Sequence, residues 1–328
     1  MGSSVQVADL LAREPGAGSG VTFARYMELA LFHPEAGYYT RNRQRVGRAR
    51  SADFYTATSL GPVFGELVVA AAVKLLGMRE ASAYAFVEIG AEPGSGMLAG
   101  VPHPFTRYEV RRLGDALLLP AKAVVFSNEL FDAQPCHRLV ARGGSWRELG
   151  VAVRAGRLVE VELPTLSPEV VAVSNRLPAE TPEGYHLDLP LRSTALLQQL
   201  SSQVWSGLFL AFDYGRSWQE MAEAMPAGSA RAFYQQAQSN DLLAHPGEQD
   251  LTCDVCWDWL VENLGQHDFA TPKVESQEAF LARHAGEALA RMMTADAGRF
   301  TERKQAIMHL LHPAHMGQKF QVLQALRD

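Results

Sequence analysis

The chain has 328 residues, of which 47% are hydrophobic and 20% charged, and it carries a formal net charge of -6. This length supports one large or two modest folded domains, and the composition excludes a disordered or fibrous protein. The negative charge argues against a nucleic-acid partner, because neutralising phosphates requires clustered Lys and Arg. The one basic run, Arg41 to Arg50, is more typical of a solvated loop.

The sequence also predicts where the protein works. The most apolar stretch, Leu67 to Leu76, is far shorter than the roughly 20 residues of a membrane span, so no membrane segment is expected. The start of the chain has no apolar signal core, and three cysteines are too few for a disulfide framework. These features predict a cytosolic protein.

The elements begin with helices. Apolar residues from Val5 to about Leu76 recur at helical spacing, which predicts an N-terminal helical cap over residues 1–80. Three apolar runs follow, each ending in a polar residue or a glycine, as is typical of buried parallel strands. These runs are Tyr84 to Gly90, Ala123 to Asn128 and Leu208 to Asp213. Ligands of open α/β sheets bind at the ends of such strands.

The remaining elements surround these strands. Alternating apolar and polar residues from His137 to Leu163 predict an antiparallel meander, and the Pro-rich stretch Pro164 to Pro190 predicts a long connection. Helices are expected over Ser193 to Trp205 and over Gln277 to Leu311. A last segment, Lys319 to Leu323, predicts an edge strand.

A glycine-rich turn follows the first of the three strands. Gly90, Gly94 and Gly96 would let the backbone approach a bound cofactor closely, although such turns serve NAD, FAD and S-adenosylmethionine (SAM) alike, or serve only as tight turns. Glu88 stands at the end of the strand, where a buried carboxylate needs a hydrogen-bond donor or a ligand. The loop is the best candidate cofactor site, with a satisfied structural carboxylate as the alternative for Glu88.

Polar residues also follow the second strand. Asn128, Glu129 and Asp132 place an amide and two carboxylates on a turn toward the expected cleft. Paired carboxylates can fix the planar donor fork of an arginine guanidinium. The alternative is that the acids cap the following helix.

Two further motifs predict less. Cys253-x-x-Cys256 has metal-ligand spacing, but no second pair accompanies it and Trp257 to Leu260 is typical of an amphipathic helix, so no metal site is expected. In the polar run His245 to Thr252, a loop histidine is more often structural than an acid or base, and Asp250 is a candidate helix cap.

The order of several separated strings resembles the MidA-like family of SAM-dependent methyltransferases, which includes a mitochondrial complex I assembly methyltransferase. The agreement covers nearly the whole chain. The matching strings include Tyr26-Met27, His33-Pro34, Gly37-Tyr38-Tyr39, Asp53-Phe54-Tyr55-Thr56, Phe64-Gly65-Glu66, Glu88-Ile89-Gly90, Asn128 to Ala133, Asp213-Tyr214-Gly215, His245 to Thr252, and Met316-Gly317 with Phe320.

The resemblance implies an α/β class I methyltransferase fold, a mostly parallel, doubly wound, Rossmann-like sheet ending in an antiparallel hairpin. The core would span residues 81–328, with insertions around 134–192 and 216–250. It also implies SAM as cofactor and a protein substrate methylated on arginine. Under this reading Glu88, Gly90, Gly94 and Gly96 hold the cofactor, and Asn128, Glu129 and Asp132 orient the acceptor. An oligomer is compatible with the sequence.

The sequence also departs from the family pattern. Ala91 and Glu92 are inserted into the family's Gly-Pro-Gly-x-Gly loop, and Leu98 to Asn128 is short. The acid that would bind the ribose hydroxyls is then Glu109 or Asp115, which follow or end the expected second strand. Two other family strings are altered to Ala52-Asp53-Phe54 and Ala57-Thr58-Ser59.

These departures leave two functions open. The first is an active methyltransferase of a protein side chain. The second is a catalytically silent binding or assembly protein that kept the fold while its cofactor pocket was trimmed. An NAD-dependent oxidoreductase would use the same glycine logic, but the other strings give it no support.

Overall fold

The computed structural model describes residues 6–40, 61–94, 96–235 and 237–328. The basic run from Arg41 to Arg50 and the strings between Ala52 and Ser59 lie outside the described residues. The chain forms two compact units. The sheet unit comprises residues 55–130, 196–215 and 257–328, and the second unit comprises residues 1–54, 131–195 and 216–256.

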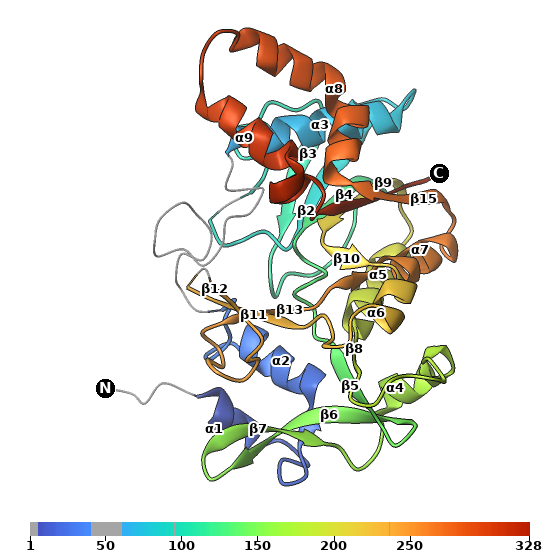
Figure 1. The fold of residues 1–328 in the computed structure, drawn as a ribbon. Coiled ribbons are helices and arrows are strands. Elements are labelled where there is room, and N and C mark those ends of the chain that lie inside the picture. The colour runs from blue at the N-terminus through green and yellow to red at the C-terminus, as the bar shows by residue number, and fades with distance from the viewer. Residues whose placement is uncertain (1–5, 41–60, 95, 236) are drawn as a thin grey trace. The chain divides into compact units, whose positions relative to one another are not determined.

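The sheet unit contains a six-stranded mixed sheet with the order β15-β16-β9-β4-β2-β3 (Figure 1). Four strands are parallel, and the other two form an antiparallel pair at one end of the sheet. The parallel strands are β2 (Ala85–Ile89), β3 (Arg107–Arg111), β4 (Lys122–Asn128) and β9 (Ser206–Asp213), and the antiparallel pair is β15 (Phe269–Ser276) with β16 (Gln321–Arg327). Two helices separate β15 from β16 along the chain, so this pair is not the hairpin that the family resemblance implies. The three strands predicted from apolar runs are β2, β4 and β9.

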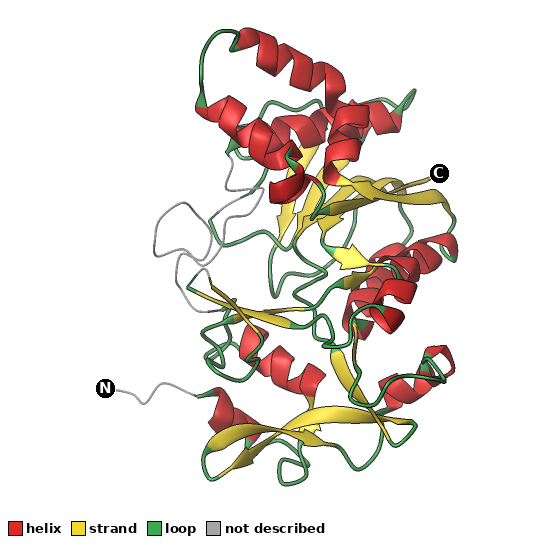
Figure 2. Ribbon diagram, viewed as in Figure 1, coloured by secondary structure: helices red, strands yellow, loops and turns green. Residues whose placement is uncertain are grey.

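Helices cover both faces of this sheet, as the helix and strand colouring of Figure 2 shows. On one face, Leu208, Leu210 and Phe212 of β9 share a core with α3 (Pro62–Leu76), α8 (Gln277–Ala295) and α9 (Glu302–Leu311). On the other, α7 (Trp257–Gly265) packs on the antiparallel pair β15-β16 and contacts the end of α5 (Leu191–Ser201), where Ser201 Oγ donates to Asn263 Oδ1 at 2.9 Å. Helices on both faces of a parallel sheet define an α/β fold.

The connections between the first parallel strands are short. Parallel neighbours usually need a crossover of a dozen or more residues, most often a helix. Here residues 112–121 between β3 and β4 hold only turns and irregular backbone, and the described part of residues 90–106 between β2 and β3 contains no helix either. The short stretch from Leu98 to Asn128 therefore reflects absent crossover helices, and β3 forms the edge of the sheet.

The boundaries and two elements differ from the predictions. Helix α3 belongs to the sheet unit because it packs on α8 and α9, so the compact units do not divide at residue 80. The predicted edge strand is instead interior, because β15 pairs with the far side of β16. The burial of β15 does not alternate, which hid it from the sequence pattern. The stretch Pro164 to Pro190 is not a plain connection, since it contains α4 (Pro168–Ala172) and β8 (His186–Leu189).

The second unit is built on the predicted meander. Strands β5 (His137–Arg142), β6 (Ser145–Arg154) and β7 (Arg157–Glu162) form its antiparallel sheet together with β1 (Val21–Thr22) and β8. Positive φ angles at Gly143 and Gly144 (55° and 72°) and at Ala155 and Gly156 (49° and 74°) confirm the two hairpin turns. The predicted insertions 134–192 and 216–250 fall inside segments of this unit.

The rest of the second unit is small. Helices α1 (Val7–Leu11) and α2 (Phe23–Phe32) share an apolar cluster with β6 and β13. The remaining short elements are α6 (Trp218–Glu223), β11 (Arg231–Tyr234), β12 (Ala237–Ser239), β13 (Asp250–Thr252) and β14 (Val255–Cys256), while β10 (Gly215–Arg216) lies at the boundary between the units. Among the described residues, no helix is long and apolar enough to cross a membrane.

Candidate cofactor and active site

The carboxyl ends of β2, β4 and β9 meet at one edge of the parallel sheet, where open α/β sheets bind ligands. The register places Ile89 beside Ser127 and Asn128 beside Phe212. The glycine loop after β2, the Asn128-Glu129 turn after β4 and Asp213 at the end of β9 therefore gather at this carboxyl edge. All of them belong to the sheet unit.

The three glycines of the loop have different roles. A Cβ atom on Gly90 would lie 2.7 Å from Leu130 Cδ1, and one on Gly96 would lie 2.5 Å from Tyr108 Oη, so a larger residue at either position would displace these side chains. Gly94 has a φ of 73°, and a Cβ there would meet no atom of the described residues within 4 Å. Within the described part of the loop, Gly94 is thus the glycine whose surroundings leave room for a ligand.

Glu88 uses its carboxylate within the chain. The residue is 4% exposed, and Oε2 accepts a hydrogen bond from Met97 N at 2.7 Å and another from Tyr108 Oη. Burial raises the pKa of Glu88, and these two donors partly offset that rise. Glu88 and Tyr108 therefore brace the glycine loop, and Tyr108 is a site residue that the sequence reasoning missed.

Neither candidate ribose acid stands at the end of β3. Glu109 lies inside the strand, where Arg107 (2.5 Å) and Arg111 pair with its carboxylate and hold its pKa below the ordinary value although burial opposes them. Asp115 accepts from Arg112 N at 2.8 Å on an exposed turn. The residue directly after β3 is Arg112, so a cation occupies the position where an acid commonly binds ribose hydroxyls.

Glu129 has a strained backbone at the end of β4. Its φ is 50°, in the left-handed region that few residues other than glycine adopt, and its N–H donates to Phe212 O at 2.9 Å. Asn128 Nδ2 donates to Glu129 Oε1 at 2.8 Å and so orients the carboxylate. Such strain is characteristic of functional sites, where surrounding contacts maintain it.

Two buried polar atoms lie beside this turn. Ser127 Oγ and Asn128 Oδ1 are buried and have no hydrogen-bond partner in the described parts of the chain. Buried polar groups are normally satisfied, so these two atoms could form hydrogen bonds with a ligand at the carboxyl edge. The open surroundings of Gly94 and these two atoms fit a polar cofactor such as SAM, whereas Arg112 supplies no acceptor for its ribose hydroxyls.

Asp213 fixes the third part of this edge. Its carboxylate accepts from Leu130 N at 3.2 Å and from Tyr214 N at 2.9 Å, and the residue is fully buried. Asp213 therefore ties the end of β9 to the turn after β4. An apolar run ending in Asp was the sequence signal for it.

Asp132, the third predicted catalytic residue, belongs to the second unit. It is buried, and its carbonyl accepts from Cys253 N at 2.8 Å. Within that unit, burial first and then the charges of Asp250 and Asp132 raise the pKa of Tyr39 far above its ordinary value. Asp132 and Asp250 thus lie near Tyr39, and Asp250 lies in β13 and caps no helix.

The other sequence motifs of the second unit are structural. The ring of His245 stacks on Tyr234 with 4.1 Å between centroids, and Cys136, Cys253 and Cys256 are buried free thiols. The described residues contain no cluster of three or more His, Cys, Asp or Glu side chains that could hold a metal. Trp257 begins α7, which confirms the predicted amphipathic helix.

The fold defines the class of protein: an α/β protein whose parallel strands end at an edge that carries a glycine-rich loop and buried polar groups. Residues 106–273 match the model of a family described as "Putative S-adenosyl-L-methionine-dependent methyltransferase". The chain belongs to this family, and SAM is its cofactor. The resemblance of the separated sequence strings to the MidA-like methyltransferases is therefore confirmed.

Known relatives agree with this assignment. The mitochondrial protein arginine methyltransferase NDUFAF7 homolog of Drosophila melanogaster is 29% identical over 92% of this chain and 80% of its own, and the NDUFAF7 protein of Mus musculus is 24% identical over 92% and 79%. A crystal structure of a Burkholderia thailandensis protein bound to S-adenosyl-homocysteine has a TM-score of 0.84 and 25% identity, covering 98% of this chain and 91% of that one.

These relatives also correct one expectation. The NDUFAF7 proteins of Drosophila melanogaster, Mus musculus and Danio rerio are named as mitochondrial, which contradicts the predicted cytosolic location. Few cysteines and a chain start without an apolar signal core do not distinguish the cytosol from other reducing compartments.

Proposed function

We propose that this SAM-dependent methyltransferase acts on an arginine side chain of a protein, with Glu129 as the carboxylate that binds the guanidinium. The observation that carries the proposal is the left-handed backbone of Glu129 together with the amide of Asn128 on its carboxylate. Both hold an acid at the carboxyl edge, next to the glycine loop. The names of the relatives, which are protein arginine methyltransferases, support the same substrate class.

The cofactor would lie along the glycine loop, where the absence of a side chain on Gly94 leaves space for it. Ser127 Oγ and Asn128 Oδ1 would be its polar contacts. When bound, SAM supplies a methyl group activated by a sulfonium. The carboxylate of Glu88 accepts hydrogen bonds from Tyr108 and Met97, so it holds the loop in place and does not contact the cofactor in this proposal.

The residues of the chain then have to prepare the acceptor nitrogen. A guanidinium is protonated at neutral pH, because its pKa lies far above 7, and its nitrogen gains a methyl group only with the loss of a proton. A carboxylate can hold the planar donor fork through two hydrogen bonds and is placed to receive that proton. Asn128 keeps Glu129 Oε1 in one orientation, which reduces the cost of ordering it.

The test is methyl transfer from radiolabelled SAM to arginine-containing peptides, followed by mass spectrometry of the modified residue. Glu129→Gln keeps the size of the side chain and removes its charge, so we expect at least a hundredfold lower kcat, on the order of what general-base catalysis contributes, with SAM affinity unchanged. Glu109→Gln, on β3, is the matched control and should keep its activity. Full activity of Glu129→Gln, or methylation confined to lysine, would refute the proposed role or substrate.

The catalytically silent binding protein is a second candidate, and Arg112 is the observation that favours it. A cation after β3 gives the ribose hydroxyls no acceptor, which weakens the case for tight cofactor binding. Calorimetry separates the two functions. Saturable SAM binding by folded protein supports the enzyme, and its absence supports the binding protein.

A further inference from the structure

A cavity lies in the sheet unit, at the opposite end of the parallel strands from the carboxyl edge. It has a volume of about 290 Å³ and opens between α3, α8 and the antiparallel pair β15-β16. Leu208 lines it near the start of β9, whereas Asp213 ends that strand at the carboxyl edge. Five residues of strand separate the two positions by about 16 Å, so the cavity is separate from the methyl-transfer site.

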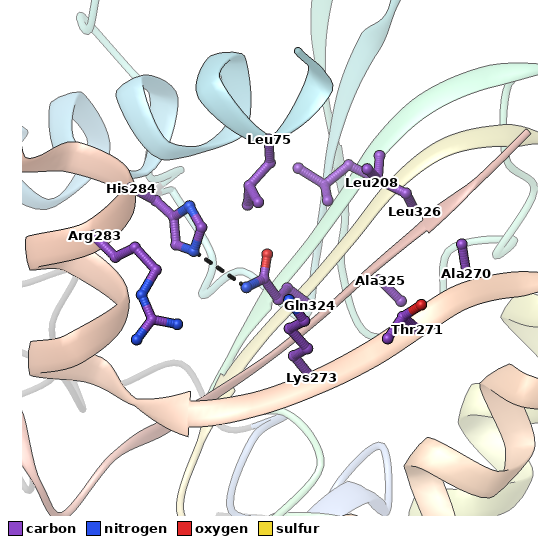
Figure 3. A pocket seen from close by; sticks show the side chains of 10 residues that line it. All are labelled: Leu75, Leu208, Ala270, Thr271, Lys273, Arg283, His284, Gln324, Ala325 and Leu326. Carbon is purple, nitrogen blue, oxygen red and sulfur yellow. Dashed lines mark hydrogen bonds between the residues drawn. The ribbon is translucent and has the colours of Figure 1, made fainter.

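One side of the cavity is apolar. Leu75 of α3, Leu208 of β9 and Leu326 of β16 come together there, as Figure 3 shows. The cavity has the volume of roughly ten water molecules at liquid density. Leu208 is fully buried, so water in the cavity meets Leu75 and Leu326. Water against these apolar side chains gains little hydrogen bonding, so an apolar group of a ligand would replace it favourably.

The other side of the cavity is polar and internally hydrogen-bonded. Gln324, only 6% exposed, donates through Nε2 to Glu275 Oε1 at 3.0 Å, and its Nε2 lies 3.3 Å from His284 Nε2. Arg283 lies 3.0 Å from the other oxygen of Glu275. Burial first, and the charges of Arg283 and Lys74, lower the pKa of His284, although Glu275 opposes them.

The charges around this wall are mostly positive. Lys273 and Arg283 line the cavity, and Lys74 Nζ donates to the carbonyl of Arg283 at 2.7 Å. Glu275 is the one carboxylate beside these three cations, and it already accepts a hydrogen bond from Gln324 and pairs with Arg283. The electrostatic balance at the polar side favours an anion.

From this combination we propose that the cavity binds a small carboxylate with a short apolar chain, the chain on Leu75 and Leu326 and the carboxylate toward Lys273 and Arg283. A ligand pocket commonly combines an apolar lining with a few polar groups that fix orientation. This one lies at the lower end of the usual size range, which suits a chain of a few carbons.

Calorimetric titration with hexanoate tests the proposal, with hexanol and hexylamine as ligands of the same chain and different charge. We expect hexanoate to bind more tightly than hexanol and hexylamine not to bind. SAM should leave hexanoate binding unchanged, because the two sites are separate. No binding of hexanoate, displacement of hexanoate by SAM, or equal binding of inorganic phosphate would overturn the proposal.

Variants locate the site. Lys273→Glu replaces attraction by repulsion at an exposed position and should weaken hexanoate binding about fivefold. Ala270→Trp, also exposed and lining the cavity, should abolish binding by filling it. Lys319→Glu makes the same charge change away from the cavity and should have no effect. Circular dichroism and SAM binding confirm that each variant is folded, and unaltered hexanoate affinity in both cavity variants would refute the assignment.

Discussion

The hydrogen bond from Tyr108 to Glu88 allows a quantitative prediction, because it joins the half-buried Tyr108 to the buried carboxylate of Glu88 under the glycine loop. Tyr108→Phe removes one of the two donors that Glu88 has for its carboxylate. A hydrogen bond to a charged group contributes about 1.5–3 kcal/mol, so we expect a loss of about 2 kcal/mol of unfolding free energy at pH 8. The SAM affinity should also fall, since the loop loses its brace.

The stability lost in Tyr108→Phe should depend on pH, and the direction follows from the raised pKa of Glu88. Burial raises the pKa of Glu88 in the folded state above its value of 4.5 in the unfolded chain. The folded state then binds more protons, so the contribution of Glu88 to stability is greatest below pH 4.5 and falls as the pH rises through its folded pKa. Tyr108→Phe raises that pKa further. The stability difference between variant and wild type should therefore grow from pH 4 to pH 8.

Denaturant unfolding at pH 4 and pH 8 measures the effect, with Tyr84→Phe as the matched control. Tyr84 is also buried, and its hydroxyl makes no hydrogen bond among the described residues, so its loss should cost little. In a Glu88→Gln background, Tyr108→Phe should cost less than in the wild type. Equal losses at both pH values, together with full additivity in the double variant, would refute the role given to this pair.

Two further predictions concern the cofactor edge. Gly94→Trp should weaken SAM binding at least tenfold, and its left-handed φ of 73° should cost about 1–2 kcal/mol of stability. Gly96→Ala should lower stability because its Cβ would meet Tyr108. Calorimetry measures the SAM affinity and thermal unfolding the stability, and unchanged SAM affinity in folded Gly94→Trp would place the cofactor elsewhere. Arg112→Glu restores an acid after β3 and should raise SAM affinity about fivefold, a gain near 1 kcal/mol, measured by the same titration; weaker binding would show that the arginine itself contacts the cofactor.

Local sequence patterns determined much of this protein. Apolar runs ending in polar residues identified β2, β4 and β9, because a parallel strand buried on both faces needs a continuous apolar segment. The family resemblance came from short strings whose order survives low overall identity. The glycines after β2 and the polar turn after β4 could also be located from the sequence, because each directly follows a strand that its apolar run predicts.

Tertiary structure decided which side chains are available. The sequence offered Glu109 as the acid that binds ribose hydroxyls. In the structure, Arg107 and Arg111 of the same strand pair with its carboxylate. The register of β3 also shows that the strand ends at Arg111, so Arg112 is the residue that follows it. The partnership of Tyr108 with Glu88 joins residues of neighbouring strands, and the position of β16 inside the sheet depends on its pairing with β15. Such pairings depend on contacts between distant segments, which a local pattern of polarity does not encode.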